Sequence, residues 1–277
     1  MKHAVVAIFL SCLGFAQDNK IPELNTILME STFRIHGPKK DQTDKISFGT
    51  SFLMGKPVPS DKAKLYYVLV SAGHVYDEID GDDAFLLMRK PKADGTYDTP
   101  LWKIKLRDNG KNLYVKNPSA DVAALYVDMP DDLNVTVVPT ALLATDELLK
   151  RFEVHPGDEL MTLGFPLLVS SPFGYPVLRS GRISSFPIIP TNVVKRIYFN
   201  FNVFSGNSGG PVYFVDRHRY YQGQTHLGEV IQFVIGVEIE ELRAALFDNQ
   251  PLGVAGVVPS PFIIETIDSL PATSPYK

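Results

Sequence analysis

Cysteine is nearly absent from this chain of 277 residues, which has a single one, Cys12. One thiol cannot close an internal disulfide or supply the ligands of a cysteine-based zinc site. Strong charge of one sign is also lacking, since the formal net charge is −4 and the basic residues occur singly or in pairs. We therefore expect no binding of nucleic acid and a fold held together by its hydrophobic core.

Long apolar runs are missing too, so no segment is predicted to anchor the chain in a membrane. The run near the N-terminus is short: a basic start at Lys2 precedes apolar residues 4–13 and a small-residue end at Ala16. This pattern predicts a signal peptide over residues 1–16, cleaved after about Ala16, and hence a secreted or periplasmic protein. A buried N-terminal helix and a lipoprotein signal with Cys12 lipidated are the alternatives. Without residues 1–16 the chain has no cysteine and cannot be a cysteine hydrolase.

Short segments rich in β-branched and aromatic residues recur along the chain, separated by Gly, Pro, Asn and Asp. Many short strands with regular turn signals are typical of an all-β sandwich or barrel. We expect strands over residues 31–35, 47–54, 65–71, 85–88, 101–106, 122–127, 135–138, 159–165, 196–201, 211–215, 232–237 and 253–258. Two helices are predicted, over 145–152 with Thr145 as cap and over 260–270 with Ser260 as cap and Pro261 at the first helical position. The polar stretch 126–134 is expected to link two β halves.

The string FSGNSGGPV at residues 204–212 is the most specific in the chain. A serine becomes a nucleophile when a base takes its proton, and the oxyanion that then forms needs N–H donors close by. Gly206 permits a tight turn that aims its own N–H and that of Ser208 at one point. An ordinary glycine-rich turn is the plain alternative, and the string also fits the nucleophile elbow of α/β-hydrolases. That elbow needs a helix after the serine, whereas residues 211–215 are typical of a strand.

His74 and Asp121 are the candidates for the base and for the acid that orients it. His74 follows a predicted strand through a small-residue turn, and a rigid strand end can place an imidazole accurately. Asp121 opens the apolar segment 122–127, where a carboxylate is costly unless it is paired. The acidic run at 77–83 lacks the alternating ligands of a calcium loop, so we expect it to be a solvated loop. No metal or other cofactor is predicted.

The order His74, Asp121, Ser208 is the order of the chymotrypsin-like peptidases. The sequence resembles the trypsin-like serine peptidases, especially their bacterial branch without disulfides. SAGH at 71–74 resembles the family's histidine turn, ADVA at 120–123 its aspartate strand, and GNSGGP at 206–211 its nucleophile loop. GFP at 164–166 and GRIS at 181–184 resemble the strand pair that opens the second barrel. The resemblance covers residues 31–267.

The resemblance implies an all-β fold of two six-stranded antiparallel barrels with a C-terminal helix and an active site between the barrels. Residues 17–128 would form the N-terminal barrel, which carries His74 and Asp121. Residues 129–277 would form the C-terminal barrel, which carries the nucleophile Ser208 and the helix.

Further site residues follow from the same resemblance. Gly206 and Ser208 would donate the N–H groups of the oxyanion hole. The substrate pocket would include Asn202, Ile239, Glu240 and Gly253. Glu240 and the next residue, Glu241, could favour a basic side chain of the substrate, or they could form a solvated turn or begin a short helix.

The residue before the nucleophile departs from the animal enzymes of this family. Those enzymes carry an aspartate there, which pairs with a newly freed N-terminus, whereas this chain has Asn207. We therefore expect an enzyme that is competent once its signal peptide is removed.

The sequence thus predicts a serine endopeptidase that acts on polypeptide substrates through an acyl-enzyme. A catalytically inactive, protease-like binding module is one alternative, and an esterase or lipase of α/β type is another. A chaperone-protease would need a further peptide-binding domain, for which we expect no room after residue 270. Residues 216–229 exceed what the core fold needs and are expected either to shape substrate access or to decorate the surface.

Overall fold

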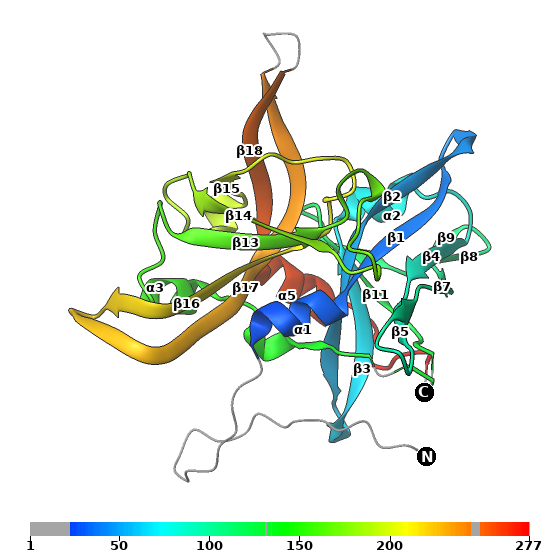
Figure 1. Cartoon of the computed structure of the whole chain (residues 1–277), viewed down its shortest axis with the longest axis horizontal. Helices are drawn as coiled ribbons and strands as arrows, with labels where there is room; N and C mark the ends of the chain where they lie inside the picture. The colour runs from blue at the N-terminus through cyan, green and yellow to red at the C-terminus, as the bar shows by residue number, and fades with distance from the viewer. Residues whose placement is uncertain (1–22, 131, 134, 245–249, 277) are drawn as a thin grey trace.

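The computed structural model describes residues 23–276 except 131, 134 and 245–249. Within them the chain forms two sets of antiparallel strands side by side, with helices α1 and α5 where the two sets meet (Figure 1). The predicted all-β architecture is therefore confirmed, and the alternating strands and helices of an α/β-hydrolase are not found. The predicted signal peptide, with Cys12, lies outside the described residues.

The first set is a sheet of eight strands in the spatial order β10-β11-β3-β2-β1-β4-β7, with β12 paired to β2. Its strands are β1 (Thr32–Lys39), β2 (Gln42–Val58), β3 (Asp61–Ser71), β4 (Asp83–Leu87), β7 (Leu101–Lys105), β10 (Val115–Lys116), β11 (Ala123–Tyr126) and β12 (Val138–Pro139). Two short hairpins stand apart from it, β5 (Lys90–Pro91) with β6 (Tyr97–Asp98) and β8 (Arg107–Asp108) with β9 (Lys111–Asn112). In the described residues this sheet does not close on itself, so the first half is a more open version of the expected barrel.

The second set is a closed barrel of six strands, as predicted. In spatial order these are β13 (Glu159–Gly164), β14 (Val177–Ile183), β15 (Ile197–Asn200), β18 (Gln250–Pro259), β17 (Gln224–Ala244) and β16 (Pro211–Tyr221). The pairing of β13 with β14 joins Leu160 to Gly181, so the two segments assigned to one strand pair do lie side by side.

Two hydrophobic cores fill these sheets, and the first extends across both halves of the molecule. Besides side chains of β1 to β4 and β11, it takes in Leu163 and Val237 of the barrel and Phe262 and Ile263 of α5. The second core lies inside the barrel and includes the stacked rings of Phe214 and Phe233. Because each buried apolar side chain contributes about 1.5–3 kcal/mol, the shared core docks the halves firmly. The division at residues 128 and 129 stays a prediction.

Both predicted helices are present, one of them with a different cap. Helix α3 (Asp146–Arg151) has Thr145 as its N-cap, and the Thr145 hydroxyl accepts a hydrogen bond from the Leu148 N–H at 3.3 Å. Helix α5 (Ser260–Asp268) begins one residue earlier than expected, with Pro259 as N-cap. The prediction of Ser260 as cap was wrong, because its buried hydroxyl instead donates to the Val234 carbonyl of β17 at 2.6 Å.

Three helices were not predicted: α1 (Leu24–Ser31), α2 (Gly73–Glu78) and α4 (Thr191–Val194). Helix α1 buries Leu24, Leu28 and Ser31, a helical spacing, whereas Ser31 was expected to start a strand. Helix α2 spans six residues and its preceding residue Ala72 offers no side-chain cap, so the sequence carries little helical signal there. His74 therefore sits on a helix rather than in a turn.

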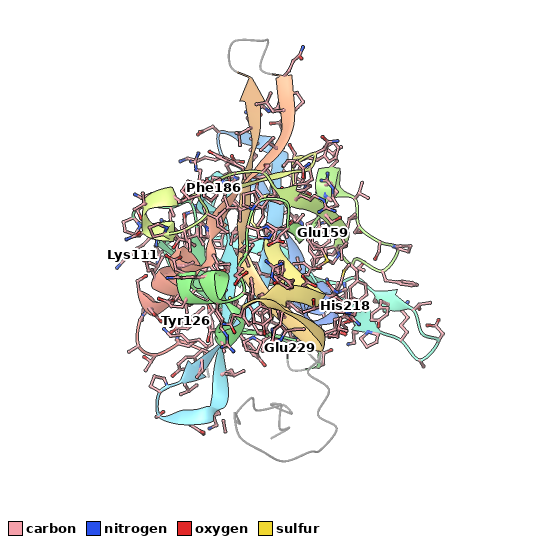
Figure 2. All side chains as sticks on the ribbon, turned by 90° about the vertical axis from the view of Figure 1, so that its left-hand side faces the viewer. Lys111, Tyr126, Glu159, Phe186, His218 and Glu229 are labelled. Carbon is pink, nitrogen blue, oxygen red and sulfur yellow. The ribbon has the colours of Figure 1, made fainter. Side chains whose placement is uncertain are left out.

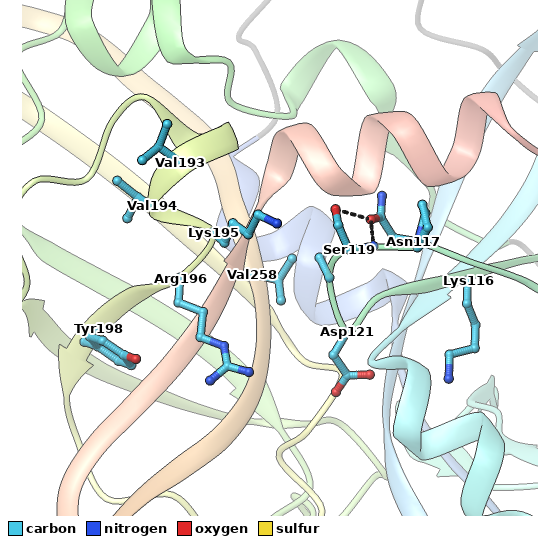
Figure 3. Close-up of a pocket in the computed structure, with 12 residues that line it drawn as sticks. Lys116, Asn117, Ser119, Asp121, Val193, Val194, Lys195, Arg196, Tyr198 and Val258 are labelled. Carbon is cyan, nitrogen blue, oxygen red and sulfur yellow. Dashed lines mark hydrogen bonds between the residues drawn. The ribbon is translucent and has the colours of Figure 1, made fainter.

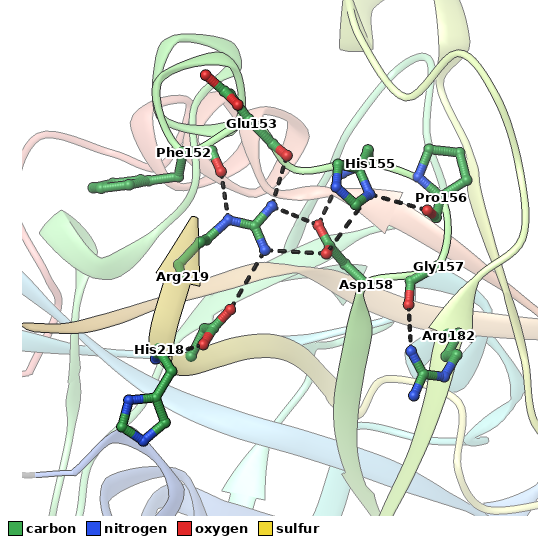
Figure 4. A network of polar contacts seen from close by, with 10 residues as sticks. Phe152, Glu153, His155, Pro156, Gly157, Asp158, Arg182, His218 and Arg219 are labelled. Atoms are coloured by element: carbon green, nitrogen blue, oxygen red, sulfur yellow. Dashed lines mark hydrogen bonds and ion pairs between the residues drawn. The ribbon is translucent and has the colours of Figure 1, made fainter. Parts of the chain in front are cut away.

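Residues 216–229 form the outer part of the β16–β17 hairpin, which turns at residues 222 and 223. Figure 2 is viewed from the side of the molecule on which this hairpin lies, with His218 and Glu229 on its two strands. It is tied to the barrel by Arg219, whose side chain is buried and donates to the carbonyls of Phe152 and Glu153 and to the Asp158 carboxylate at 2.7 Å (Figure 4). The insertion is thus a mostly exposed hairpin, fastened to the barrel near α3 by the buried Arg219 and Tyr221.

Candidate active site

His74 and Asp121 are held together by two hydrogen bonds. The imidazole Nδ1 lies 2.6 Å from Asp121 Oδ2, and the His74 backbone N–H donates to Asp121 Oδ1 at 3.0 Å. The pairing of β11 with β3, in which Ala123 faces Ser71, brings the two chain segments side by side. Asp121 therefore fixes both the ring and the start of α2.

Gly73 makes this close approach possible. A Cβ atom at residue 73 would lie 2.8 Å from Asp121 Oδ1 and 3.0 Å from Lys116 Cε. Any side chain here would push the carboxylate away from the imidazole. Gly73, one of the small residues before His74, is therefore needed for this close approach and not for a turn.

The electrostatics of the pair favour a charged imidazole next to a carboxylate. Burial lowers the pKa of His74, but the hydrogen bond and charge of Asp121, helped by Glu78 and Asp77, outweigh it and raise the pKa above its usual value. For Asp121, burial acts in the opposite direction and raises the pKa. The hydrogen bonds and charge of His74, together with the charge of Lys116, outweigh burial and lower this pKa below its usual value. The imidazole is therefore suited to take up a proton.

Ser208 lies beside this pair, on the segment between β15 and β16. Gly49 of β2 separates the two: a Cβ there would be 2.7 Å from Val75 Cγ1, next to His74, and 3.1 Å from the Ser208 carbonyl oxygen. The half-buried Ser208 hydroxyl donates to the Ile239 carbonyl at 3.3 Å. Among the described residues it makes no hydrogen bond to His74.

The N–H groups of Gly206 and Ser208 point to no other group of the described chain. Around them, the Asn207 N–H donates to the Phe204 carbonyl at 3.1 Å and the Gly210 N–H to the Asn207 carbonyl at 2.9 Å. Gly206 has a φ of 100°, and a Cβ there would lie 2.3 Å from the Phe165 carbonyl oxygen. Only glycine fits, and both N–H groups are available to an outside acceptor.

Thr50 of β2 is a site residue that the sequence did not reveal. It is fully buried, its hydroxyl donates to the Gly206 carbonyl at 2.6 Å, and its N–H donates to the Ser208 carbonyl at 2.9 Å. The same hydroxyl accepts from the Phe165 N–H at 3.3 Å. One threonine of the first half therefore anchors the nucleophile segment of the second. No sequence pattern marks it, because its partners lie more than 100 residues away.

The candidate pocket residues are partly brought together. Asn202 Oδ1 lies 3.1 Å from where a Cβ of Gly253 would be, and Ile239 contacts Ser208 as described above. Arg179 of β14, which was not predicted, donates to the Asn202 carbonyl and lies over the Phe204 ring at 5.0 Å.

Glu240 and Glu241 lie within the long strand β17, so the alternative of a turn or a helix from residue 241 was wrong. In the sequence, an acidic pair followed by Leu-Arg-Ala-Ala suggested a helix start. The pairing of β17 with β18 overrides this local preference. Preference for a basic substrate side chain stays a prediction.

A cavity of about 660 Å³ opens beside Asp121, between the two halves (Figure 3). One wall is the segment from Lys116 to Asp121, and the other is formed by residues 193–196 with Tyr198 and Val258. The cavity lies directly against the acid of the His74–Asp121 pair, and neither His74 nor Ser208 is among its lining residues.

The described residues show neither a metal site nor a membrane-spanning helix. No group of three or more His, Cys, Asp or Glu side chains is arranged to hold a metal ion there. Of the helices in that part of the chain, none has the length and apolar character needed to cross a bilayer.

Comparison with known proteins gives matches in structure only. No protein-family model and no curated protein sequence matches the chain. The structure is similar to the protease Anisep from Arthrobacter nicotinovorans, with a TM-score of 0.52, 13% identity, and coverage of 88% of this chain and 96% of that one. It is also similar to AL20, a thermostable serine protease from an extremophilic microorganism, with a TM-score of 0.51, 10% identity, and coverage of 90% and 100%. The chain therefore has the trypsin-like fold of these serine proteases.

Proposed function

We propose that this protein is an exported serine endopeptidase that hydrolyses peptide bonds with His74 as base, Asp121 as orienting acid and Ser208 as nucleophile. The observation that carries the proposal is the doubly bonded His74–Asp121 pair, which lies next to a serine flanked by free N–H groups. The trypsin-like fold, which Anisep and AL20 share, supports the same conclusion.

The first step is attack by Ser208 Oγ on the carbonyl carbon of the substrate. For this step the hydroxyl leaves the Ile239 carbonyl and donates to His74 Nε2 instead. As the C–O bond forms, the proton passes from Oγ to Nε2 and the carbonyl π electrons move to the substrate oxygen. Asp121 stabilises the imidazolium without taking the proton.

The resulting oxyanion is placed to accept hydrogen bonds from the Gly206 and Ser208 N–H groups. Removal of one such donor costs about 10²–10³ in kcat in other enzymes, which sets the scale of their contribution. The imidazolium then gives its proton to the leaving amine, the C–N bond breaks and an acyl-enzyme remains. Water repeats the sequence: His74 takes a proton from it, and Ser208 leaves with that proton.

Fluorophosphonate labelling tests the proposal against its main alternative, an inactive protease-like binding module. We expect stoichiometric labelling at Ser208 and cleavage of a peptide library. Ser208→Ala should abolish the labelling and lower the rate by about 10⁴–10⁶-fold. An unlabelled wild-type protein, or equal cleavage by Ser208→Ala, would end the proposal.

Export and activation are tested on the same protein. Mass determination of the protein from the exported fraction should give a chain that begins at about Gln17. A chain produced without residues 1–16 should cleave peptides at once, because Asn207 has no charge with which to bind a newly freed N-terminus. If the chain without residues 1–16 is inactive until it is cut again, the prediction about activation is refuted, while the proposed function is not.

A further inference from the structure

Glu238 of β17 is a buried acid that the proposed mechanism does not use. Its exposed fraction is 0%, and no other acidic side chain in the described part of the chain is classed as buried. Among the described residues it has no ion pair within salt-bridge distance. A buried carboxyl group is costly unless its surroundings satisfy it, so its presence here calls for a physical reason.

The backbone of Glu238 is bonded to the chain immediately after the nucleophile. The Gly209 N–H donates to the Glu238 carbonyl at 2.7 Å, and the Glu238 N–H donates to the Gly210 carbonyl at 2.9 Å. On the other side of the nucleophile lies Asn207, which is among the groups that lower the pKa of Glu238, although Glu238 Oε1 makes no hydrogen bond of ordinary geometry within the described residues. The backbone of Glu238 thus holds the chain just after Ser208.

Asn207 has few other polar neighbours. It is 1% exposed, and neither polar atom of its side chain makes a hydrogen bond of ordinary geometry within the described residues. The backbone of Gly164 packs directly on it: a Cβ at residue 164 would lie 2.9 Å from Asn207 Oδ1 and 3.1 Å from Asn207 Cα. Glu238 Oε1 is likewise buried without a hydrogen bond of ordinary geometry in the described residues, and Asn207 is among the groups that act on its carboxyl.

The other neighbours of the carboxyl group can be named element by element. Strand β13 contributes the Thr162 hydroxyl, which donates to Glu238 Oε2 at 3.1 Å, and β18 contributes the apolar Val257 at the paired position. Strand β14 contributes the positive charge of Arg179, the one charged group among the described residues that acts on Glu238. The nucleophile segment contributes Asn207.

We propose that Glu238 is a positioning residue for the nucleophile segment: its backbone bonds to Gly209 and Gly210, and its buried carboxyl group, held by Thr162 and turned to Asn207, keep residues 206–210 in the conformation that presents the N–H groups of Gly206 and Ser208. The inference rests on the proposed function. It gives Asn207 a partner in the place where animal enzymes of the resembling family use a charged pair.

Titration of this carboxyl group would then limit activity at alkaline pH. Burial raises the pKa of Glu238 to about 8, although the Thr162 hydroxyl, the Arg179 guanidinium and the Asn207 amide each lower it. Below that pH the group is neutral and can both donate and accept. Above it, the group only accepts, and the buried charge attracts Arg179 and the amide N–H of Asn207. The residue next to Ser208 then changes its orientation.

The decisive experiment is the pH dependence of kcat for wild type and Glu238→Gln, with a peptide substrate between pH 6 and 10. Glutamine has the same shape and can still bond to both neighbours, but it cannot ionise. We expect wild-type kcat to fall above about pH 8, approaching tenfold per pH unit, and Glu238→Gln to keep near wild-type kcat at pH 7 without this decline. An unchanged alkaline decline in Glu238→Gln would overturn the proposal.

Thr162→Val provides a second test that does not alter the acid itself. The hydroxyl lowers the pKa of Glu238, so its removal should move the alkaline decline to higher pH. A shift to lower pH, or no shift, contradicts the proposal. Thr136→Val, which removes an exposed hydroxyl that donates to Glu30, is the matched control and should leave the profile unchanged.

Thermal unfolding gives a readout that needs no activity. A carboxyl group with a raised native pKa costs stability as pH rises from its unfolded pKa to its native one, so the wild-type Tm should fall between about pH 5 and 8 more than that of Glu238→Gln. If the wild type is active and the pH dependences of kcat and Tm are equal in wild type and Glu238→Gln, only the role of Glu238 is refuted. A wild type that neither cleaves nor labels at Ser208 refutes the proposed function instead.

Discussion

Thr50→Val removes a single hydroxyl group from the contact between the two halves. Valine keeps the branched shape of threonine, so the packing of this fully buried side chain is preserved. What is lost is the hydrogen bond to the Gly206 carbonyl at 2.6 Å and the one from the Phe165 N–H at 3.3 Å. Both backbone groups are then left buried without a partner.

The expected loss follows from these two bonds. A buried polar group without a partner costs about 1–3 kcal/mol, and the longer of the two bonds is the weaker. We therefore expect Thr50→Val to lower the free energy of unfolding by about 2–4 kcal/mol. Gly206 also loses an anchor next to the oxyanion site. Its N–H stays present but is held less firmly, so kcat should fall by about 10–100-fold, less than the loss of a whole donor.

Urea denaturation and peptide cleavage of the folded protein measure the two effects separately. Thr50→Ser keeps the hydroxyl and should stay within about threefold of wild-type kcat. Ser51→Ala is the control in the same strand, because its buried hydroxyl lies 3.5 Å from the Phe33 carbonyl, the limit of a hydrogen bond. If Thr50→Val matches wild type in both stability and kcat, the hydroxyl does not anchor the nucleophile segment.

Three further predictions follow from the contacts described. Asp121→Asn should lower kcat by about 10⁴-fold in a peptide-cleavage assay, because the imidazole loses the anionic partner that fixes its reactive tautomer. A loss below about tenfold would contradict the assignment of Asp121. Activity should be present above the raised pKa of His74 and be lost as pH falls through it, with a midpoint above 6.5, the usual value; a midpoint below 6.5 in kcat/KM would be inconsistent with the pair. Arg219→Met should cost about 3–5 kcal/mol in urea denaturation, because it leaves the Asp158 carboxylate unpaired, while the kcat of the folded protein is unchanged; a large fall in kcat would mean that the hairpin acts on the site.

The sequence predicted most strands of the fold, because alternating burial and turn residues are local signals. The barrel strand β14 is absent from the predicted strands, and only the resemblance of residues 181–184 pointed to it. The strand expected over residues 135–138 is reduced to the two residues of β12, since only its end pairs with β2. Helix α2 was missed because its six residues carry no cap and no full helical repeat, and its place is set by the hydrogen bond between its His74 N–H and Asp121. Caps that depend on tertiary partners, such as Ser260 with Val234, are equally invisible in the sequence.

For the candidate site, the sequence predicted the residues that would carry the chemistry but not the residues that support them. His74, Asp121 and Ser208 stand in recognisable strings, whereas Thr50 and Glu238 stand in ordinary strand segments. Their partners are brought near only by the docking of two β systems. The sequence also could not show that the Ser208 hydroxyl donates to the Ile239 carbonyl and not to His74, because this depends on the three-dimensional structure.

The anchoring of the nucleophile segment by Thr50 has a consequence for synthesis of the chain. The segment that bears His74 and Asp121 emerges from the ribosome well before Ser208, and the N–H groups beside Ser208 are held in place by a strand made much earlier. Helix α5, later still, bonds back to the first half, where Asn117 Nδ2 donates to Glu265 Oε2 at 3.2 Å. A nascent chain therefore has no assembled candidate oxyanion site until both β systems have been made and have docked.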